Sequence, residues 1–252
     1  MKKLLCLTLV VILVLGLLAA CGKEPEPTEP AQPAEKKLHQ SANGIETQDN
    51  GWMRKDLTAL ELTRLMGNGT NLGNTMEACD TSLGSIHRNN PSYYESCWGQ
   101  PTTTQEMISG MKAAGFDTIR VPVAWMTNAT KLAEGDATIS DAYFNRVEEI
   151  INYALNEDMY VIINDHWDGG WYGMFGSESQ QTRDRAMEAY KSMWTQIANR
   201  YKEYSDYLIF EGANEEIGTR FDENSDLYCD DSVTTYYTDE EKYALANQIN
   251  QV

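Results

Sequence analysis

The sequence predicts an α/β fold built from repeating strand–helix units, and two patterns carry that prediction. Short runs rich in β-branched and aromatic residues begin near residues 69, 117, 159 and 207, at intervals of about 40 to 48 residues. A stretch with helical periodicity follows each run. The third run, Met159–Asn164, is apolar on both faces, which is typical of a strand buried in a parallel sheet.

Two architectures share this alternation, the doubly wound sheet and the (β/α)8 TIM barrel. A doubly wound sheet usually has a glycine-rich phosphate-binding turn after its first strand, and the residues at that place, Asn71–Asn74, do not form one. Polar residues gather instead directly after the strands, where the functional residues of a barrel lie. We therefore predict a (β/α)8 barrel, of which this chain contains about the first four β/α units.

Capping residues mark the start of three predicted helices. Thr103 with Glu106, and Thr238 with Glu241, have the spacing of a capping box, and Ser140 is a favourable N-cap residue. Apolar residues at helical spacing follow each of them, and also precede the fourth strand. The predicted core-facing positions are Met107, Ile108, Met111 and Ala114; Phe144, Val147, Ile151 and Ala154; Met193, Ile197 and Tyr201; and Leu245, Ile249 and Val252.

The N-terminal segment predicts export from the cytoplasm. Residues 1–20 combine two lysines with an apolar run that is too short to span a bilayer comfortably, as in a signal peptide. The run ends in Leu-Ala-Ala before Cys21, which resembles the lipobox of bacterial lipoproteins. We expect lipidation at Cys21 and a secreted protein that this lipid anchors to a bacterial membrane, facing the extracellular side. The alternative is an ordinary signal peptide with an unrelated cysteine.

The rest of the chain divides into a linker and one domain. Residues 21–45 contain four prolines among Glu, Lys and Gln, with too few apolar residues to form a core. We predict that this segment is a tether. Residues 46–252 contain the β/α units and form the predicted domain.

Charge and cysteine content limit the partners. The chain has 38 acidic and 20 basic residues, so it lacks the basic surface that nucleic acids require, and we expect no nucleic-acid partner. The mature chain keeps Cys79, Cys97 and Cys229, whose spacing matches no metal site. Both a Cys79–Cys97 disulfide and three thiols fit the sequence. We expect no cofactor and no bound metal, although the acidic stretch 222–231 has carboxylates of the kind that bind Ca²⁺.

The segment after the fourth strand is the most informative about function. It contains Glu211, Asn214 and Glu215. Cleavage of a glycosidic bond needs an acid that protonates the leaving oxygen and a group that holds the sugar 2-hydroxyl, and Glu215 and Asn214 have these chemistries. The alternative for Glu215 is an acidic side chain on a solvated loop.

Other strand ends supply groups suited to sugars. The third strand leads into His166, Trp167 and Trp171, and indole faces can stack on sugar rings while polar groups bind the hydroxyls. The alternative is a structural histidine and two core indoles. Arg120 lies on the second strand, and because an unpaired buried arginine is costly, we expect it to meet a carboxylate. A purely structural ion pair is the alternative role for Arg120.

Together these motifs resemble glycoside hydrolase family 5, the cellulase family among the (β/α)8 glycosidases. The resemblance runs from about Asn68 to the last residue and corresponds to the N-terminal half of the family's barrel. It depends on the order and spacing of short motifs, none of which is specific alone. These motifs are Asn71–Thr75; Trp98, Gly99 and Pro101; Ala114–Phe116; Thr118–Pro122 and Trp125; Asn164 and His166; and Glu211, Asn214 and Glu215.

The resemblance implies a retaining endo-β-1,4-glycanase of the cellulase type, acting outside the cell on a β-linked polysaccharide such as cellulose or mixed-linkage glucan. It implies that Glu215 is the general acid/base, that Asn214 binds the sugar 2-hydroxyl and that Arg120 steadies the nucleophile. His166 matches a histidine that lines the cleft. The full set of predicted substrate-binding residues is Arg120, His166, Asn214, Trp167, Trp171 and Asn74.

The sequence departs from the family in three respects. Glu216 stands where the family usually has proline, and Trp167 where many members have a second histidine. The family's nucleophilic glutamate lies on the seventh strand and has no counterpart in these residues. We therefore expect an N-terminal fragment that is inactive alone. The alternatives are a non-catalytic glycan-binding lipoprotein, and a mannanase or xyloglucanase on the same scaffold.

Overall fold

A computed structural model describes residues 39–40, 46–78, 90–130, 137–215 and 237–252. The predicted signal peptide, Cys21 and most of the predicted linker 21–45 lie outside these ranges, as do Cys79, Cys229, Glu216 and the acidic stretch 222–231. None of the helices within the described ranges combines the length and hydropathy of a membrane-spanning segment. From the predicted linker, His39–Gln40 (β1) is described, and it pairs with Glu46–Thr47 (β2) in an antiparallel ladder.

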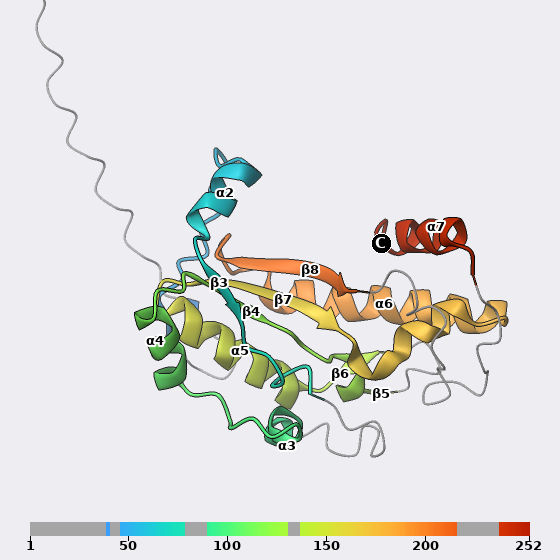
Figure 1. Ribbon diagram of the computed structural model, residues 1–252, viewed down its shortest axis with the longest axis horizontal. Coiled ribbons are helices and arrows are strands. Elements are labelled where there is room, and N and C mark those ends of the chain that lie inside the picture. The colour runs from blue at the N-terminus through green and yellow to red at the C-terminus, as the bar shows by residue number, and fades with distance from the viewer. Residues whose placement is uncertain (1–38, 41–45, 79–89, 131–136, 216–236) are drawn as a thin grey trace, which may run out of the picture. The chain divides into compact units, whose positions relative to one another are not determined.

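The centre of the fold is a four-stranded parallel sheet with the order β3-β4-β7-β8 (Figure 1). The predicted strand starts agree with the observed ones to within one residue. The strands are Gly69–Asn71 (β3), Thr118–Val121 (β4), Tyr160–His166 (β7) and Leu208–Asn214 (β8). Because neighbouring strands follow one another in chain order, the sheet has no point at which the strand order reverses, as a doubly wound sheet has.

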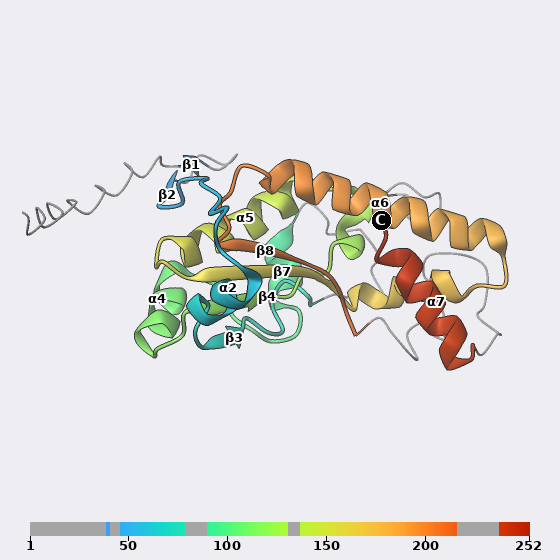
Figure 2. The same ribbon diagram turned by 90° about the horizontal axis from the view of Figure 1, so that it is seen from above.

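The helices that connect the strands lie along the same side of the sheet (Figures 1 and 2). They are Gln105–Ala113 (α4), Asp141–Leu155 (α5) and Gln180–Tyr201 (α6). One helical layer outside a parallel sheet is the arrangement of a barrel wall, whereas a doubly wound sheet has helices on both faces. The remaining elements are Ala59–Leu65 (α2), Pro91–Ser96 (α3), Asp239–Ile249 (α7), the short β-ladder between Ala129–Thr130 (β5) and Thr138–Ile139 (β6), and the 3₁₀ segments Met126–Asn128 and Asp168–Gly176.

The hydrophobic core fills the space between the sheet and these helices. Ile119 and Val121 of β4, and Val161 and Ile163 of β7, are buried toward the helices. The predicted faces of α5 and α6 are confirmed, since all seven of their residues are buried: Phe144, Val147, Ile151, Ala154, Met193, Ile197 and Tyr201. The predicted face of α4 is only partly correct, because Ile108 is buried but Ala114 is exposed, and Val252 at the end of the chain is half-exposed.

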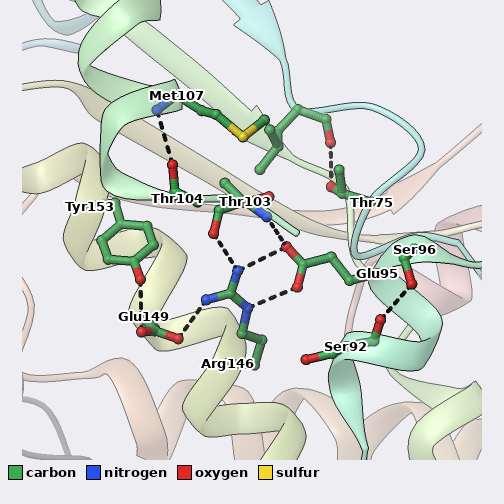
Figure 3. Close-up of polar contacts among 11 residues, drawn as sticks. Thr75, Ser92, Glu95, Ser96, Thr103, Thr104, Met107, Arg146, Glu149 and Tyr153 are labelled. Atoms are coloured by element: carbon green, nitrogen blue, oxygen red, sulfur yellow. Dashed lines mark hydrogen bonds and ion pairs between the residues drawn. The ribbon is translucent and has the colours of Figure 1, made fainter. Parts of the chain in front are cut away.

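The caps agree with the sequence in two of three helices. The Ser140 hydroxyl accepts a hydrogen bond from the backbone of Tyr143, and Thr238 forms the predicted capping box with Glu241. The cap of α4 is Thr104 and not the predicted Thr103. The backbone of Thr103 is occupied elsewhere in the fold, as described below (Figure 3).

Candidate active site

Polar side chains from successive strands meet at the carboxyl-terminal edge of the sheet. In the parallel register Asn164 lies opposite Glu211, and beyond a bulge His166 lies opposite Asn214. Arg120 lies level with Ile162 of β7, which is two residues before Asn164. Since alternate residues of a strand share a face, the side chains of Arg120, Asn164 and Glu211 lie on the same face of the sheet, away from the helices. This is where the functional residues of a barrel lie.

Arg120 forms a two-pronged ion pair with Glu211. Its Nε donates to one carboxylate oxygen at 2.8 Å and its Nη2 to the other at 2.5 Å, and Nη2 also donates to the amide oxygen of Asn214 at 2.8 Å. The prediction that Arg120 meets a carboxylate is confirmed. Both partners keep contact with solvent, with 21% and 34% of their side chains exposed. Arg120 therefore fixes both Glu211 and one end of the Asn214 amide.

Asn164 holds the other side of the cluster. It is fully buried, and its amide nitrogen lies 3.3 Å from a Glu211 carboxylate oxygen and 3.2 Å from Nδ1 of His166. Its amide oxygen accepts from the backbone of Val123, which defines the amide orientation. With the Asn164 nitrogen as donor, Nδ1 of His166 is the acceptor, so a neutral ring carries its proton on Nε2. Asn164 therefore orients both the carboxylate and the imidazole.

The charge of Arg120 determines the ionisation of Glu211. Partial burial alone would raise the pKa of Glu211, but the hydrogen bonds and positive charge of Arg120 outweigh it and hold this pKa below its ordinary value. The hydrogen bond and the charge of Glu211, followed by the charges of Glu77 and Glu215, raise the pKa of Arg120 although burial opposes this. Glu211 is thus an anion at neutral pH and a poor proton donor.

Glu215 ends the strand in an unusual backbone conformation. It follows Asn214 directly, its side chain is exposed, and its φ is +52°, in the left-handed region that non-glycine residues rarely adopt. Such conformations cluster at functional sites. The charge of Glu215 is close enough to Arg120 to contribute to the raised pKa of the guanidinium. The structure therefore brings together Arg120, His166, Asn214 and Glu215 from three strands.

The loop after β3 adds a carboxylate that sequence reasoning missed. Glu77 is buried and accepts hydrogen bonds from the backbone N–H groups of Asn74 and Thr75. Burial raises the pKa of Glu77 above its ordinary value, and the nearby charge of Arg120 opposes this. Asn74, a predicted substrate-binding residue, is exposed and has a φ of +61°. The hydrogen bonds that Glu77 accepts therefore stabilise this turn. Its position after a strand end was the signal that could have identified it.

The two predicted tryptophans have different surroundings. Trp167 is partly exposed at the end of β7, with its ring centroid 6.1 Å from that of the exposed Trp98. Trp171 is completely buried among Tyr172, Phe175 and Tyr190, and its indole N–H donates to Asp165. The prediction that Trp171 binds substrate is therefore wrong. The chain turns inward at Gly169 and Gly170, which both have positive φ, and this turn places the Trp171 indole in the core.

Two carboxyl groups close in sequence to these tryptophans stabilise the loop after β7. Asp165 and Asp168 are both fully buried and share a hydrogen bond. Asp168 also accepts from the backbone N–H groups of Met126 and Thr127 and from the Thr127 hydroxyl. Burial raises the pKa of Asp168 to about 6. Within the described ranges, no group of three or more His, Cys, Asp or Glu side chains has the geometry to hold a metal ion.

A parallel barrel wall with an arginine–carboxylate–amide cluster and a glutamate at its strand ends defines the class of a (β/α)8 glycosidase domain. Comparison with known families gives the same class. The family model "Cellulase (glycosyl hydrolase family 5)" matches residues 79–244, which is more than half of the chain. The chain belongs to glycosyl hydrolase family 5.

Two curated relatives illustrate the similarity. A xyloglucan-specific endo-β-1,4-glucanase of Bacteroides ovatus is 40% identical over 207 residues, which are 81% of this chain and 36% of that protein. Endoglucanase B of Clostridium cellulovorans is 41% identical over 161 residues, 64% of this chain and 32% of that protein. The chain thus spans about a third of the length of these relatives.

Solved structures agree on the fold. A broad-specificity endoglucanase of Clostridium longisporum superposes with a TM-score of 0.63 at 32% identity, covering 79% of this chain and 51% of that one. The Bacteroides ovatus xyloglucanase, solved with a heptasaccharide, gives a TM-score of 0.61 at 34% identity, with 87% and 41% covered. These neighbours are (β/α)8 barrels, so the predicted fold is confirmed: the chain corresponds to part of such a barrel.

Proposed function

We propose that this chain supplies the acid/base half of a retaining endo-β-1,4-glucanase that cleaves β-linked polysaccharides. The observation that carries the proposal is the joint fixation of Glu211 and Asn214 by Arg120, immediately before Glu215. A protein that only binds glycans needs neither an acid at this place nor a carboxylate held anionic beside it. The family membership of the chain, and its similarity to endoglucanases, support the same activity.

Each residue has a chemical role in this proposal. Glu215 protonates the leaving glycosidic oxygen and then deprotonates the attacking water. Arg120 binds the amide oxygen of Asn214, so the amide nitrogen is the end that donates to a sugar 2-hydroxyl. Glu211 remains ionised and holds the guanidinium in place. His166 and Asn74 contribute to the walls of the substrate cleft.

A retaining mechanism requires a second carboxylate as nucleophile, about 5 to 5.5 Å from the acid/base. Glu211 is held in its ion pair with Arg120, and Asp168 is fully buried, so neither suits that role. We propose that the nucleophile belongs to a segment beyond the four β/α units of this chain, and that these 252 residues alone are inactive. The test compares the 252-residue chain with the product of its complete reading frame.

The release of reducing sugar from carboxymethyl cellulose by the complete product tests the activity. Glu215→Gln keeps the shape of the side chain but cannot transfer a proton, and we expect it to remove at least about 99% of the activity. Glu203→Gln, an exposed carboxylate after α6, is the matched control and retains the wild-type rate. Wild-type turnover by Glu215→Gln would refute the assignment. Proton NMR of the first product distinguishes the mechanism, since retention predicts the β-anomer.

Xyloglucan is the second candidate substrate. It is favoured by the Bacteroides ovatus relative, whose name specifies xyloglucan, and which matches 81% of this chain. The two substrates share the β-1,4-linked glucan backbone, so both use the same cluster. The ratio of kcat/KM for xyloglucan to that for carboxymethyl cellulose distinguishes them, and a ratio well above one would identify xyloglucan as the preferred substrate. Activity on mannan instead would contradict both.

We further propose that the protein is anchored outside the cell by lipid at Cys21. The support is the sequence alone: the apolar run, the Leu-Ala-Ala sequence before Cys21 and the proline-rich linker. Mass spectrometry of the membrane fraction should find an N-terminal diacylglyceryl cysteine. Cys21→Ala should move the protein out of the membrane fraction. Unchanged membrane association in Cys21→Ala would refute the lipid anchor and leave the glycosidase proposal intact.

A further inference from the structure

Strand β8 is irregular just before its end. Its partner β7 has one residue between the positions that face Glu211 and Asn214, whereas β8 itself has two residues there, Gly212 and Ala213. Two residues opposite one make a β-bulge, which is rare between parallel strands. Bulges are over-represented beside active sites, where they change the direction of a side chain. The bulge of β8 lies directly before the proposed acid/base.

The bulge decides which way Asn214 faces. Because alternate residues of a regular strand share a face, Asn214 would otherwise lie on the face of Phe210 and not on that of Glu211. Phe210 packs on Trp194 of α6, with ring centroids 6.3 Å apart, so its face is the helix side. With the extra residue, Asn214 lies on the face of Glu211, and Nη2 of Arg120 donates to both. The bulge therefore turns Asn214 from the helix side into the candidate catalytic cluster.

Helix α6 holds the bulge through one backbone carbonyl. The Tyr190 hydroxyl and the Trp194 indole N–H both donate to the carbonyl oxygen of Gly212, each at 3.2 Å. The two donors are four residues apart, so they lie on the same face of α6. A carbonyl oxygen has two lone pairs, so two donors satisfy it without a partner in a neighbouring strand. The helix layer thus fixes the backbone at the bulge.

The Tyr190 hydroxyl has a fixed position. Tyr190 is buried, and four aromatic rings have centroids 6.3 to 6.5 Å from its own: Trp171, Tyr172, Phe175 and Trp194. Burial raises the pKa of Tyr190 to about 12, so the hydroxyl keeps its proton and remains a donor at neutral pH. A buried phenol usually needs a hydrogen-bond partner, and the Gly212 carbonyl is such a partner.

Glycine at position 212 leaves room for this contact. The φ of Gly212 is not positive, so the backbone conformation alone does not demand glycine. A Cβ at this position, however, would lie 3.2 Å from the Tyr190 hydroxyl oxygen, which is tighter than most Cβ contacts. A larger residue would therefore push against the donor that holds the bulge.

We propose that Tyr190 and Trp194 are positioning residues, which bind the Gly212 carbonyl and so hold the bulge that directs Asn214 and Glu215 into the cleft. The proposal deepens the glucanase function proposed above and rests on it. Both residues belong to the helix layer but act at the strand-end edge, through the backbone of β8. If the bulge relaxed, the change of one residue in register would turn Asn214 toward α6 and displace Glu215.

The test uses the product of the complete reading frame and two substrates. Cellohexaose releases a sugar alkoxide that needs a proton from Glu215, whereas 2,4-dinitrophenyl β-cellobioside releases a phenolate that leaves without one. Tyr190→Phe/Trp194→Phe removes both donors and keeps an aromatic ring at each position. Because a small displacement of reacting groups is costly, we expect kcat on cellohexaose to fall about thirtyfold with KM within about twofold. The loss of kcat/KM should be smaller on the aryl cellobioside.

Tyr201→Phe is the matched control. Tyr201 is a buried tyrosine on the same helix, and its hydroxyl also donates to a backbone carbonyl, that of Phe144, at 3.3 Å. Tyr190→Phe alone should lower kcat about threefold, the effect of one hydrogen bond, whereas Tyr201→Phe should keep the wild-type kcat. Equal kcat in these two variants would overturn the positioning role. So would equal losses of the double variant on the two substrates, because a smaller folded fraction lowers both rates alike.

The close approach at Gly212 gives a second test. Gly212→Ala should lower kcat, because its Cβ displaces the Tyr190 hydroxyl. Gly212→Ala/Tyr190→Phe should be no less active than Gly212→Ala alone, since the phenyl ring leaves room for the methyl group. Such non-additivity is expected of residues in contact. If the two losses multiplied, Gly212 and Tyr190 would act independently, and the proposed route through the carbonyl would be wrong.

A crystal structure of Tyr190→Phe/Trp194→Phe separates this proposal from the proposed activity. If the wild type cleaves no glucan but Asn214 leaves Arg120 in the variant, the positioning role stands and the glucanase proposal fails. If the wild type cleaves cellohexaose and the variant keeps both its kcat and the Asn214–Arg120 contact, the activity stands and the positioning role fails. If the wild type is inactive and the contact persists in the variant, both proposals are wrong.

Discussion

The two sides of the sheet each contain an arginine–glutamate pair, and the two pairs differ in their surroundings. On the helix side, Arg146 and Glu95 are 9% and 0% exposed. On the opposite face, Arg120 and Glu211 are 21% and 34% exposed. Both arginines use Nε and Nη2 for a two-pronged contact. The two-pronged contact is therefore the same in both pairs, and the pairs differ in burial and in the further partners of each arginine.

Burial determines what each pair can do. The buried pair has the backbone of Thr103 as a further partner, so it fixes a segment of the chain. The half-exposed pair borders the end of β8 and binds the amide of Asn214, which belongs to the candidate catalytic cluster. Substitutions on the helix side of this sheet should therefore change stability, and substitutions at the strand-end edge should change activity.

The largest expected effect comes from breaking the buried pair. Glu95→Ala leaves the Arg146 guanidinium with its main partner removed, and we expect the free energy of unfolding to fall by about 3 to 5 kcal/mol. Urea denaturation measures this. Glu149→Ala is a matched control on the same arginine, because Glu149 is more exposed, and its removal should cost about 1 kcal/mol or less. Equal losses in the two variants would contradict the role of burial.

The next largest expected effect is the pH dependence that Asp168 gives to the free energy of unfolding. Its folded pKa of about 6 is above its ordinary value of 3.8, so the folded state binds the proton more tightly. The protonated Asp168 carboxyl therefore stabilises the folded state by up to about 3 kcal/mol. This stabilisation is complete below about pH 4 and is lost as the pH rises through about 6. Asp168→Asn should remove this slope from the unfolding free energy, whereas Asp184→Asn, at an exposed position, should keep it. A slope that persists in Asp168→Asn would assign the titration to another group.

The Arg120–Glu211 pair at the strand-end edge should affect activity more than stability. Glu211→Gln keeps the shape of the side chain but loosens Arg120 and, through it, Asn214, so we expect kcat/KM on carboxymethyl cellulose to fall about a hundredfold. Because the pair is half-exposed, the unfolding free energy should fall by only about 1 kcal/mol. Asp117→Asn breaks the surface pair with Lys112 and is the control for both measurements. If the Arg120–Glu211 pair has only a structural role, Glu211→Gln should keep full activity.

Much of this fold is predictable from hydrophobic patterning. The four strands and the long helices were found because buried parallel strands and amphipathic helices have distinct periodicities. Helix α2 was missed although Thr58 and Glu61 have the spacing of a capping box, because the helix has only seven residues and none of them is buried in the core. The cap of α4 was misplaced by one residue because Glu95 and Arg146 hold the backbone of Thr103, and no local pattern shows a contact between residues so distant in the chain.

The site was predictable only in part. The sequence predicts that Arg120 needs a carboxylate, but only the parallel register identifies Glu211 as the partner. Glu77 was missed because its importance depends on burial and on the nearby charge of Arg120. Trp171 was assigned to the cleft because indoles near a strand end suit sugars, whereas two positive-φ glycines turn it into the core.

The two tryptophans that follow β7 differ in burial in the same way, and substitutions there should have the smallest effects. Trp171→Phe removes the indole N–H that donates to Asp165, so we expect a loss of about 1 to 2 kcal/mol in unfolding free energy and an unchanged KM for cellohexaose. Trp167→Phe, at the partly exposed edge, should change the unfolding free energy by only about 0.5 kcal/mol while raising KM severalfold. If Trp171→Phe raised KM as much as Trp167→Phe, burial would not separate packing residues from binding residues at this edge, and the division between the two sides of the sheet would have to be abandoned.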